Sequence, residues 1–300
     1  MRRAAAAVAL AGLAAVTACS GSGAAARHRP PPARYYLALG DSLSQGVQPN
    51  AAGVSVRTGH GYPDLLYATL RRRQPGLRLV KLGCPDETTV TMINGGICHY
   101  PGGSQLAAAV SFLRAHRGRV SLITLDIGAN DVESCLSSSP ATLAVCAGRS
   151  IPDAVSNVAT ILRRLRQAAP GVRVIAMNYY LPTLAEWRHG FGGQIVARLS
   201  EMAAGGYNDL LERAFHTAGV RVADVYGAFH TASFSPRVSV PGLGSLPRNV
   251  AAICQWTWEC APPPRGPNQH PNQAGYQVIA GAFLAADPAP SGAQPAPSGA

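Results

Sequence analysis

The chain has 300 residues, of which 47% are hydrophobic and 14% are charged, and its formal net charge is +11. Disorder over most of the chain is excluded, because a disordered chain combines low hydrophobicity with high charge. A protein with many membrane spans is excluded too, since no apolar run reaches the roughly 18 residues that a spanning helix needs. The arginines are scattered and form no stripe with aromatic residues between them, so no nucleic-acid partner is expected.

The N-terminus has the pattern of an export signal. Two arginines precede an apolar stretch at 4–16, which has the length of a signal-peptide core. The stretch ends in Val-Thr-Ala-Cys, which resembles the box of bacterial lipoproteins, where the cysteine is acylated. We expect a signal peptide at 1–18 and a lipid anchor on Cys19; an ordinary secretory signal, with Cys19 incidental, is the alternative. In both cases the protein is exported, and it is either anchored to the cell membrane or secreted.

Two segments rich in proline, alanine, glycine and serine flank one predicted domain. Residues 19–34 are typical of a linker. Residues 287–300 contain Pro-Ala-Pro-Ser-Gly-Ala twice and are predicted to be a disordered low-complexity tail. The domain is therefore expected at 35–286.

Short apolar runs alternate with helix-like segments along this domain. The predicted strands are 35–39, 77–82, 120–127, 172–177 and 220–223. The predicted helices are 63–72, 105–116, 152–168, 194–217 and 272–285. The third helix is expected to begin at Pro152, because proline is favoured in the first turn. The alternation predicts an α/β fold, a three-layer α/β/α sandwich around a parallel sheet of about five strands.

Four short blocks lie at or beside the carboxyl ends of the predicted strands, where ligands bind in such sheets. They are Gly-Asp-Ser-Leu-Ser at 40–44, Gly83 with the residues after it, Gly-Ala-Asn-Asp at 128–131, and His-Pro-Asn at 270–272. A serine in a sharp turn after a strand can expose its hydroxyl and its amide to a pocket. Gly-Asp-Ser alone is also common in ordinary turns and helix N-caps. The four blocks in this order are far more specific than any one of them.

Together the blocks resemble those of the SGNH, or GDSL, hydrolases, especially the secreted, disulfide-containing lipases and esterases of actinobacteria. They span the whole predicted domain, and Cys-Gln-Trp-Thr-Trp-Glu-Cys at 254–260 is similar to that branch. The resemblance implies a flavodoxin-like fold and the hydrolysis of carboxylic esters without a cofactor or a metal ion.

The resemblance also implies a role for each block. Ser42 is the implied nucleophile and His270 the implied general base, which must lie within hydrogen-bond reach of the serine hydroxyl. The implied oxyanion hole consists of the Ser42 and Gly83 amides and the Asn130 side chain. The missing Cβ of Gly83 is expected to let its backbone approach the substrate. Asp41 is expected to hold amides of the turn instead of carrying a proton.

The sequence departs from the family next to the histidine. The aspartate that usually lies three residues before it is Pro267 here, and Asn268 lies two residues before it. We therefore expect a Ser–His dyad in which His270 donates its Nδ1–H to another acceptor. A backbone carbonyl of residues 254–268 is the first choice, the side-chain oxygen of Asn268 is the second, and a more distant aspartate stays open.

Six cysteines remain besides Cys19, and they form three pairs that are close in the sequence. The expected disulfides are Cys84–Cys98, Cys135–Cys146 and Cys254–Cys260, although six cysteines allow other connectivities. An oxidising compartment outside the cytoplasm favours such bonds. No Cys-x-x-Cys motif and no closely spaced pair of histidines occurs, so no metal site is expected.

Hydrolysis of carboxylic esters through an acyl-Ser42 intermediate is the predicted function, with a small-molecule or lipid ester as substrate and a monomer as the expected state. The alternative is a catalytically weak, surface-anchored lipoprotein of the same fold that binds lipid or glycan, which only the missing carboxylate favours. A chymotrypsin-like protease is disfavoured, because its catalytic residues occur in the order His, Asp, Ser. Segments 181–193 and 234–247, which glycine and proline interrupt, are expected to line the substrate or to act as lid loops. Trp256 and Trp258 either wall the acyl pocket or pack their own loop.

Overall fold

The computed structural model describes residues 34–136 and 140–287. The predicted signal peptide, the lipid-attachment residue Cys19, nearly all of the linker and the tail from residue 288 onward lie outside these residues. Among the described residues, no helix is both long and apolar enough to cross a membrane.

The core of the fold is the predicted parallel sheet. Its strands are β1 (Arg34–Gly40), β4 (Leu77–Lys81), β5 (Val120–Asp126), β6 (Arg173–Met177) and β7 (Arg221–Ala223), in the order β4-β1-β5-β6-β7. All four neighbouring pairs are parallel. Residues 36–39 of β1, a strand with a neighbour on each side, are fully buried, which explains why this strand is a continuous apolar run without alternation. The predicted α/β fold with about five parallel strands is confirmed.

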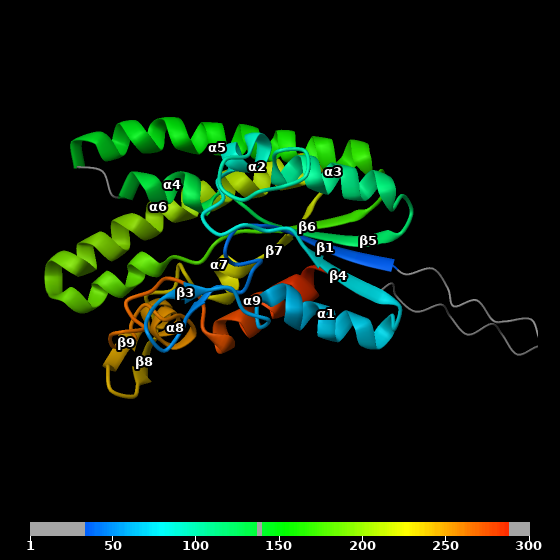
Figure 1. Ribbon diagram of the computed structural model, residues 1–300. Coiled ribbons are helices and arrows are strands. Elements are labelled where there is room, and N and C mark those ends of the chain that lie inside the picture. Colours follow the sequence, from blue (N-terminus) through cyan, green and yellow to red (C-terminus); the bar gives the residue numbers. More distant parts are fainter. Residues whose placement is uncertain (1–33, 137–139, 288–300) are drawn as a thin grey trace, which may run out of the picture. The chain divides into compact units, whose positions relative to one another are not determined.

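Helices cover both faces of the sheet (Figure 1). α1 (Tyr62–Arg73) and α9 (Gln273–Ala286) lie on one face, and α3 (Gln105–Ala115), α5 (Pro140–Ala168) and α6 (Gly190–Thr217) lie on the other. The remaining helices are α2 (Thr89–Asn94), α4 (Ala129–Leu136), the 3₁₀-helix η1 (Pro182–His189), α7 (Val225–Ala228) and α8 (Arg248–Trp256). Two small antiparallel ribbons pair β2 (Gln48–Pro49) with β3 (Ser55–Val56), and β8 (Arg237–Val240) with β9 (Gly244–Pro247).

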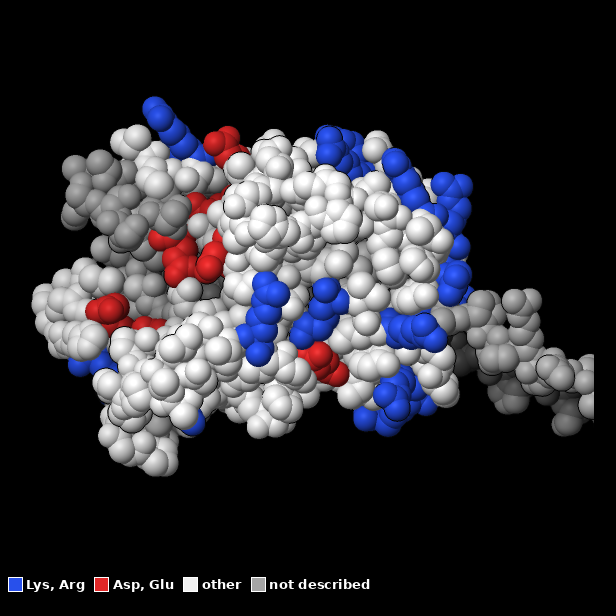
Figure 2. All heavy atoms as spheres, viewed as in Figure 1, with Lys and Arg blue, Asp and Glu red and all other residues white. Residues whose placement is uncertain are grey.

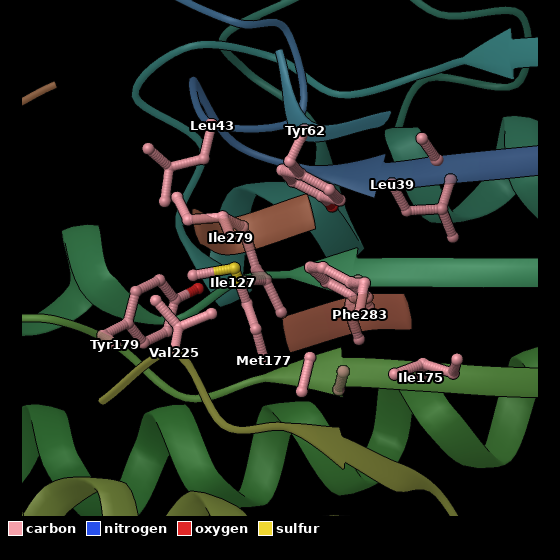
Figure 3. Packing of buried hydrophobic residues seen from close by; sticks show 14 of the residues in the cluster. Leu39, Leu43, Tyr62, Ile127, Ile175, Met177, Tyr179, Val225, Ile279 and Phe283 are labelled. Atoms are coloured by element: carbon pink, nitrogen blue, oxygen red, sulfur yellow. The ribbon is translucent and has the colours of Figure 1, made fainter. Parts of the chain in front are cut away.

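Aromatic and aliphatic side chains fill the space between the sheet and its helices (Figure 3). Tyr62 of α1 stacks on Phe283 of α9, with ring centroids 4.5 Å apart and nearly parallel planes. Both side chains are fully buried, as is Ile279, one turn before Phe283. The contact holds α9 next to α1. It therefore also helps to position His270, which lies in the segment just before α9.

The third helix begins earlier than its proline predicts. Pro152 lies inside α5, which starts at Pro140, so the expected start at Pro152 is wrong. A proline removes one backbone donor, which weakens a helix locally but does not end it when the turns on both sides are held by packing. Val158, Leu162 and Leu165 are buried after the proline, and α5 packs on α4.

The domain also extends one residue beyond its predicted end. α9 ends at Ala286, and Asp287 is buried and forms an ion pair with Arg173 at the start of β6. Asp287 therefore belongs to the domain and not to the low-complexity tail. The sequence could not show this, because the partner of Asp287 lies more than 100 residues away.

The strand order determines where a site can form. In the sheet, β4 lies next to β1 on one side and β5 lies next to β1 on the other, although β4 and β5 both follow β1 in the sequence. The loops that follow β1 and β5 therefore diverge, and a crevice opens at the carboxyl ends of these two strands, where open α/β sheets bind their ligands.

Candidate active site

Ser42 lies in the turn directly after β1, and a neighbouring strand holds this turn in place. The Asp126 carboxylate at the end of β5 accepts hydrogen bonds from the amides of Asp41 and Ser44, both at 3.1 Å. The Asp41 carboxylate accepts from the amide of Leu43 at 2.9 Å. The turn amides on either side of Ser42 are thus bound by carboxylates, while Ser42 itself is only half-buried. Two buried carboxyl groups fix the backbone and leave the serine facing outward.

Gly83 follows β4 and lies against the serine turn. A Cβ on Gly83 would come within 1.7 Å of the Ser44 Oγ and 3.1 Å of the Asp41 carbonyl oxygen. The missing side chain therefore lets two loops pack together, which is a different reason from the expected approach to a substrate. The next residue, Cys84, forms the predicted disulfide with Cys98, which closes the loop after β4.

Asn130 lies in the first turn of α4, after β5, and its side-chain amide is oriented by the loop after β4. Its Nδ2 donates to the backbone carbonyl of Glu87 at 2.8 Å. The next residue, Asp131, accepts from both the amide and the hydroxyl of Thr89. An asparagine amide has two N–H groups, so the one bound to Glu87 orients the second without using it. The Gly83 and Asn130 loops are thus joined to each other as well as to β1.

His270 lies just before α9, and Asn268 holds its ring. Asn268 Oδ1 accepts from the backbone amide of His270 at 3.1 Å and lies 2.9 Å from His270 Nδ1. Asn268 Nδ2 donates to the Ser55 hydroxyl at 3.1 Å. Of the acceptors expected for Nδ1, the structure therefore has the second choice, the Asn268 side chain, and not a backbone carbonyl.

These contacts also determine the tautomer of His270. A backbone amide can only donate, so the Asn268 atom that faces it must be the oxygen. The same oxygen faces Nδ1, and two acceptors cannot pair, so the hydrogen of the neutral ring is on Nδ1. Nε2 is then left without a proton, which is the state that a general base requires.

Burial lowers the pKa of His270 from its usual value to about 4, although the charge of Asp86 acts in the opposite direction. The ring is therefore neutral at pH 7.

The two carboxyl groups that bind the amides of the serine turn have raised pKa values. Burial raises the pKa of Asp41 to about 7, and burial together with the charge of Asp41 raises the pKa of Asp126 well above its usual range.

Ser42, Asn130 and His270 line one cavity of about 380 Å³, together with Asp41. Most of the remaining wall is apolar and comes from two regions. The loop after β6 contributes Tyr179, Tyr180 and Leu181, and the middle of α6 contributes a second wall that includes Leu199, Ala203 and Tyr207. Gly83 is not among the residues that line the cavity.

The segment around His270 is held by the loop that contains the two tryptophans. The predicted disulfide Cys254–Cys260 is present. The backbone of Trp258 bonds both the His270 carbonyl and the Asn268 amide. Trp256 packs edge-on against Phe229, and neither tryptophan is among the cavity-lining residues, so of the two expected roles the structure has the packing one.

The two interrupted segments behave differently. Residues 181–183 of the first line the cavity, as expected. The second segment, 234–247, contains the β8–β9 ribbon and contributes no residue to the cavity wall, so it does not line the site; its role as a lid stays a prediction. The predicted Cys135–Cys146 pair involves the side chain of Cys135, which lies outside the described part of the chain. Over the described residues, no group of three or more His, Cys, Asp or Glu side chains could hold a metal ion.

Two supporting residues were not predicted from the sequence. The fully buried Gln105 bonds both backbone groups of Gly40, and it donates to the Glu87 carboxylate as well. Asp126 is the other; its only sequence signal is a carboxylate at the end of an otherwise apolar strand. Both act on β1 from elements far away in the chain.

A family model described as GDSL-like Lipase/Acylhydrolase family matches residues 38–278. The chain belongs to this family. The match extends over all four blocks and supports a lipolytic or esterase function for this GDSL chain. No curated protein matches it.

Solved structures share the fold of this GDSL domain. An extracellular lipase from Streptomyces rimosus is 17% identical, with a TM-score of 0.55 over 85% of this chain and 100% of its own. Phospholipase A1 from Streptomyces albidoflavus is 19% identical, with a TM-score of 0.51 over the same shares. A lipase from a goat rumen metagenome is 15% identical, with a TM-score of 0.52 over 84% of this chain and 97% of its own. At these identities the likeness is one of fold.

Proposed function

We propose that the protein hydrolyses carboxylic esters with apolar acyl groups through an acyl-Ser42 intermediate. The observation that carries the proposal is that Ser42, Asn130 and His270 line one apolar cavity although they come from three distant parts of the sequence. The family match supports an ester hydrolase, and the two similar Streptomyces enzymes are described as a lipase and a phospholipase A1.

In the proposed reaction, His270 Nε2 takes the proton of the Ser42 hydroxyl while Oγ attacks the ester carbonyl carbon. The tetrahedral intermediate collapses when the bond to the alcohol oxygen breaks, and His270 gives its proton to that oxygen. Water then attacks the acyl-enzyme by the same route and releases the acid. Asn268 keeps Nδ1 protonated throughout, because its oxygen faces that nitrogen.

The oxyanion of the intermediate needs donors that are already in place. We assign this role to the Ser42 and Gly83 amides and to the second N–H of Asn130. Ser42 and Asn130 line the cavity, and the bond from Asn130 to Glu87 leaves its second N–H available, which supports their part of the assignment. The part of Gly83 rests on the family resemblance, since Gly83 packs against the serine turn and is not among the residues that line the cavity. Asp41 and Asp126 are assigned to positioning, since they bind amides of the turn.

The test is the hydrolysis of p-nitrophenyl esters of graded chain length by the wild type and by Ser42→Ala and His270→Ala. Both variants should lose on the order of 10⁴-fold or more in kcat/KM, and Asn130→Ala about 10²–10³-fold. The exposed Ser239→Ala and His216→Ala are matched controls that should keep the wild-type rate. Equal rates in all variants would favour the alternative, a lipoprotein that binds lipid or glycan without efficient catalysis.

We further propose that the protein acts outside the cytoplasm, as one of the secreted, disulfide-containing enzymes of its family, and that Cys19 is its lipid-attachment site. The disulfides Cys84–Cys98 and Cys254–Cys260 support export, because such bonds persist in oxidising compartments. Cys19→Ala should release the protein from the membrane fraction of the cells that produce it. Equal membrane association of both forms would contradict the anchor.

A further inference from the structure

The outer face of α6 has an unusual composition. Phe191, Ile195, Leu199 and Met202 follow one another at intervals of four, four and three residues, so they share one side of the helix. Their side chains are exposed by 79%, 42%, 61% and 70% respectively. A surface helix normally turns such residues inward and polar ones outward. We call these four side chains the α6 stripe.

The two charged residues in the same part of α6 have partners within the protein. Arg198 lies over the rings of Trp187 and Phe234, and Glu201 accepts a hydrogen bond from the Tyr226 hydroxyl. They are the only charged residues of α6 before Asp209. Arg198 is itself exposed, and it follows Ile195 by three residues and precedes Met202 by four, so it lies on the same side of the helix. The exposed side of this part of α6 is therefore apolar apart from one arginine, whose guanidinium group lies over aromatic rings. Figure 2 shows one face of the molecule, on which Lys and Arg side chains are spread over several elements and form no single stripe.

The α6 stripe is continuous with the cavity. Leu199 is a member of the stripe and also lines the cavity, and Ala203 and Tyr207 line it from the same helix. One side of α6 is thus a wall of the site, and the adjacent side is an exposed apolar surface that begins at its rim.

We propose that the α6 stripe binds a lipid surface, from which the ester substrate passes over Leu199 into the cavity. The inference rests on the proposed function, since it names the physical state of the substrate: an ester held in a membrane or micelle. Exposed contiguous apolar side chains mark interaction surfaces, and a helix that lies in a lipid interface buries such a face among the acyl chains. A protein partner on the stripe would cover the rim of the cavity, whereas a lipid surface there supplies the substrate.

The test compares vesicle binding of three forms of the full chain, each with Cys19→Ser and Ser42→Ala, so that neither an anchor nor turnover contributes. The first has no other change, the second carries Phe191→Gln and Met202→Gln, and the third carries Val90→Gln and Ile97→Gln. Val90 and Ile97 are exposed by 47% and 42% and do not line the cavity, which makes them a matched control. Vesicles of phosphatidylcholine alone avoid the attraction between a basic protein and anionic lipid.

The stripe variant should bind these vesicles about tenfold more weakly than the other two forms, as expected when two apolar side chains no longer enter the interface. Restoring Ser42 allows the kinetic comparison. Hydrolysis of dissolved p-nitrophenyl butyrate should be equal in all three forms, and hydrolysis of p-nitrophenyl palmitate carried in the vesicles should fall about tenfold in the stripe variant alone.

Equal vesicle binding by all three forms would overturn the proposal. It would also be overturned if light scattering found a dimer that only the stripe variant converts to a monomer, because the stripe would then be covered by a second copy of the chain. Failure of the proposed function looks different: dissolved p-nitrophenyl butyrate would not be hydrolysed by any form, whatever their vesicle binding.

Discussion

At the scale of single residues, Asn268 occupies the place of a carboxylate beside His270 and influences both the tautomer and the pKa of this proposed base. The amide oxygen selects the Nδ1–H tautomer as a carboxylate would, but it carries no charge to stabilise an imidazolium. Burial is then the dominant influence on the ring, and the pKa of His270 is lowered to about 4. The ring acts as a base only when it is neutral, so activity should rise as the pH rises through about 4.

Asn268→Asp should move that rise to higher pH. A carboxylate in hydrogen-bond contact favours the charged ring and raises a histidine pKa by about one to three units. The acid limb of kcat/KM should shift upward by that amount, and the rate at pH 8 should increase because the imidazolium in the transition state gains a counter-charge. Asn268→Ala is the control: it should keep the low acid limb and lose on the order of 10²-fold in rate. An unchanged acid limb in Asn268→Asp would contradict this account.

At the scale of elements, the site depends on how the loops after β1, β4 and β5 pack together. The Asp126 carboxylate joins β5 to the serine turn, and the Asn130–Glu87 bond joins the β5 loop to the β4 loop. Gly83 completes the set, because its missing side chain leaves room for Ser44. Each loop is thus positioned by its two neighbours.

Gly83→Ala should disturb this packing. The added methyl group would overlap the buried Ser44 hydroxyl, so we expect the free energy of unfolding to fall by about 1–3 kcal/mol and ester hydrolysis to fall with it. Chemical denaturation and p-nitrophenyl butyrate hydrolysis measure the two effects. Gly76→Ala is a matched control, since nothing lies near the place where its methyl group would be.

A second substitution tests the cause directly. Ser44→Ala removes the atom that the new methyl group would meet, so the double variant Gly83→Ala/Ser44→Ala should recover part of the stability lost in Gly83→Ala. Additive losses in the double variant would show that the overlap with Ser44 is not the reason.

At the scale of the whole molecule, stability depends on pH through groups that titrate differently in the folded and unfolded chain. His270 has a lowered pKa when folded, so the unfolded chain binds its proton more readily, and stability rises with pH between about 4 and 6.5. Asp41 and Asp126 have raised pKa values, so the folded chain retains protons that the unfolded chain has lost, and stability falls as the pH rises from about 4 through 7. Above pH 6.5 only the carboxyl groups act.

The melting temperature should therefore fall between pH 6.5 and 8, and Asp126→Asn should reduce this fall. An asparagine still offers an oxygen to the two turn amides but has no proton to lose. The melting temperature of Asp126→Asn minus that of the wild type should increase from pH 5 to pH 8. The exposed Asp153→Asn serves as the control, with a curve parallel to the wild type. A parallel curve for Asp126→Asn would contradict the prediction.

The sequence by itself determined the fold class and the order of its strands along the chain. Continuous apolar runs of four to eight residues, separated by amphipathic segments, are required of strands that are buried on both faces. The same reasoning places Ser42, Gly83 and Asn130 at strand ends, because chemistry in an open α/β sheet occurs at that edge. Their motifs carried the family resemblance, and a match over residues 38–278 shows that family.

Only the tertiary structure decided which distant groups support the site. Asn268 and not a backbone carbonyl faces His270 Nδ1, Gln105 and Asp126 hold the strand and turn that carry Ser42, and α5 continues through Pro152. Each of these depends on partners that are far apart in the chain, and local patterns of hydrophobicity and turn residues contain no information about them. The α6 stripe is the same kind of feature: its residues read as an ordinary apolar helix face, and only the packing of α6 decided that this face is left exposed beside the cavity.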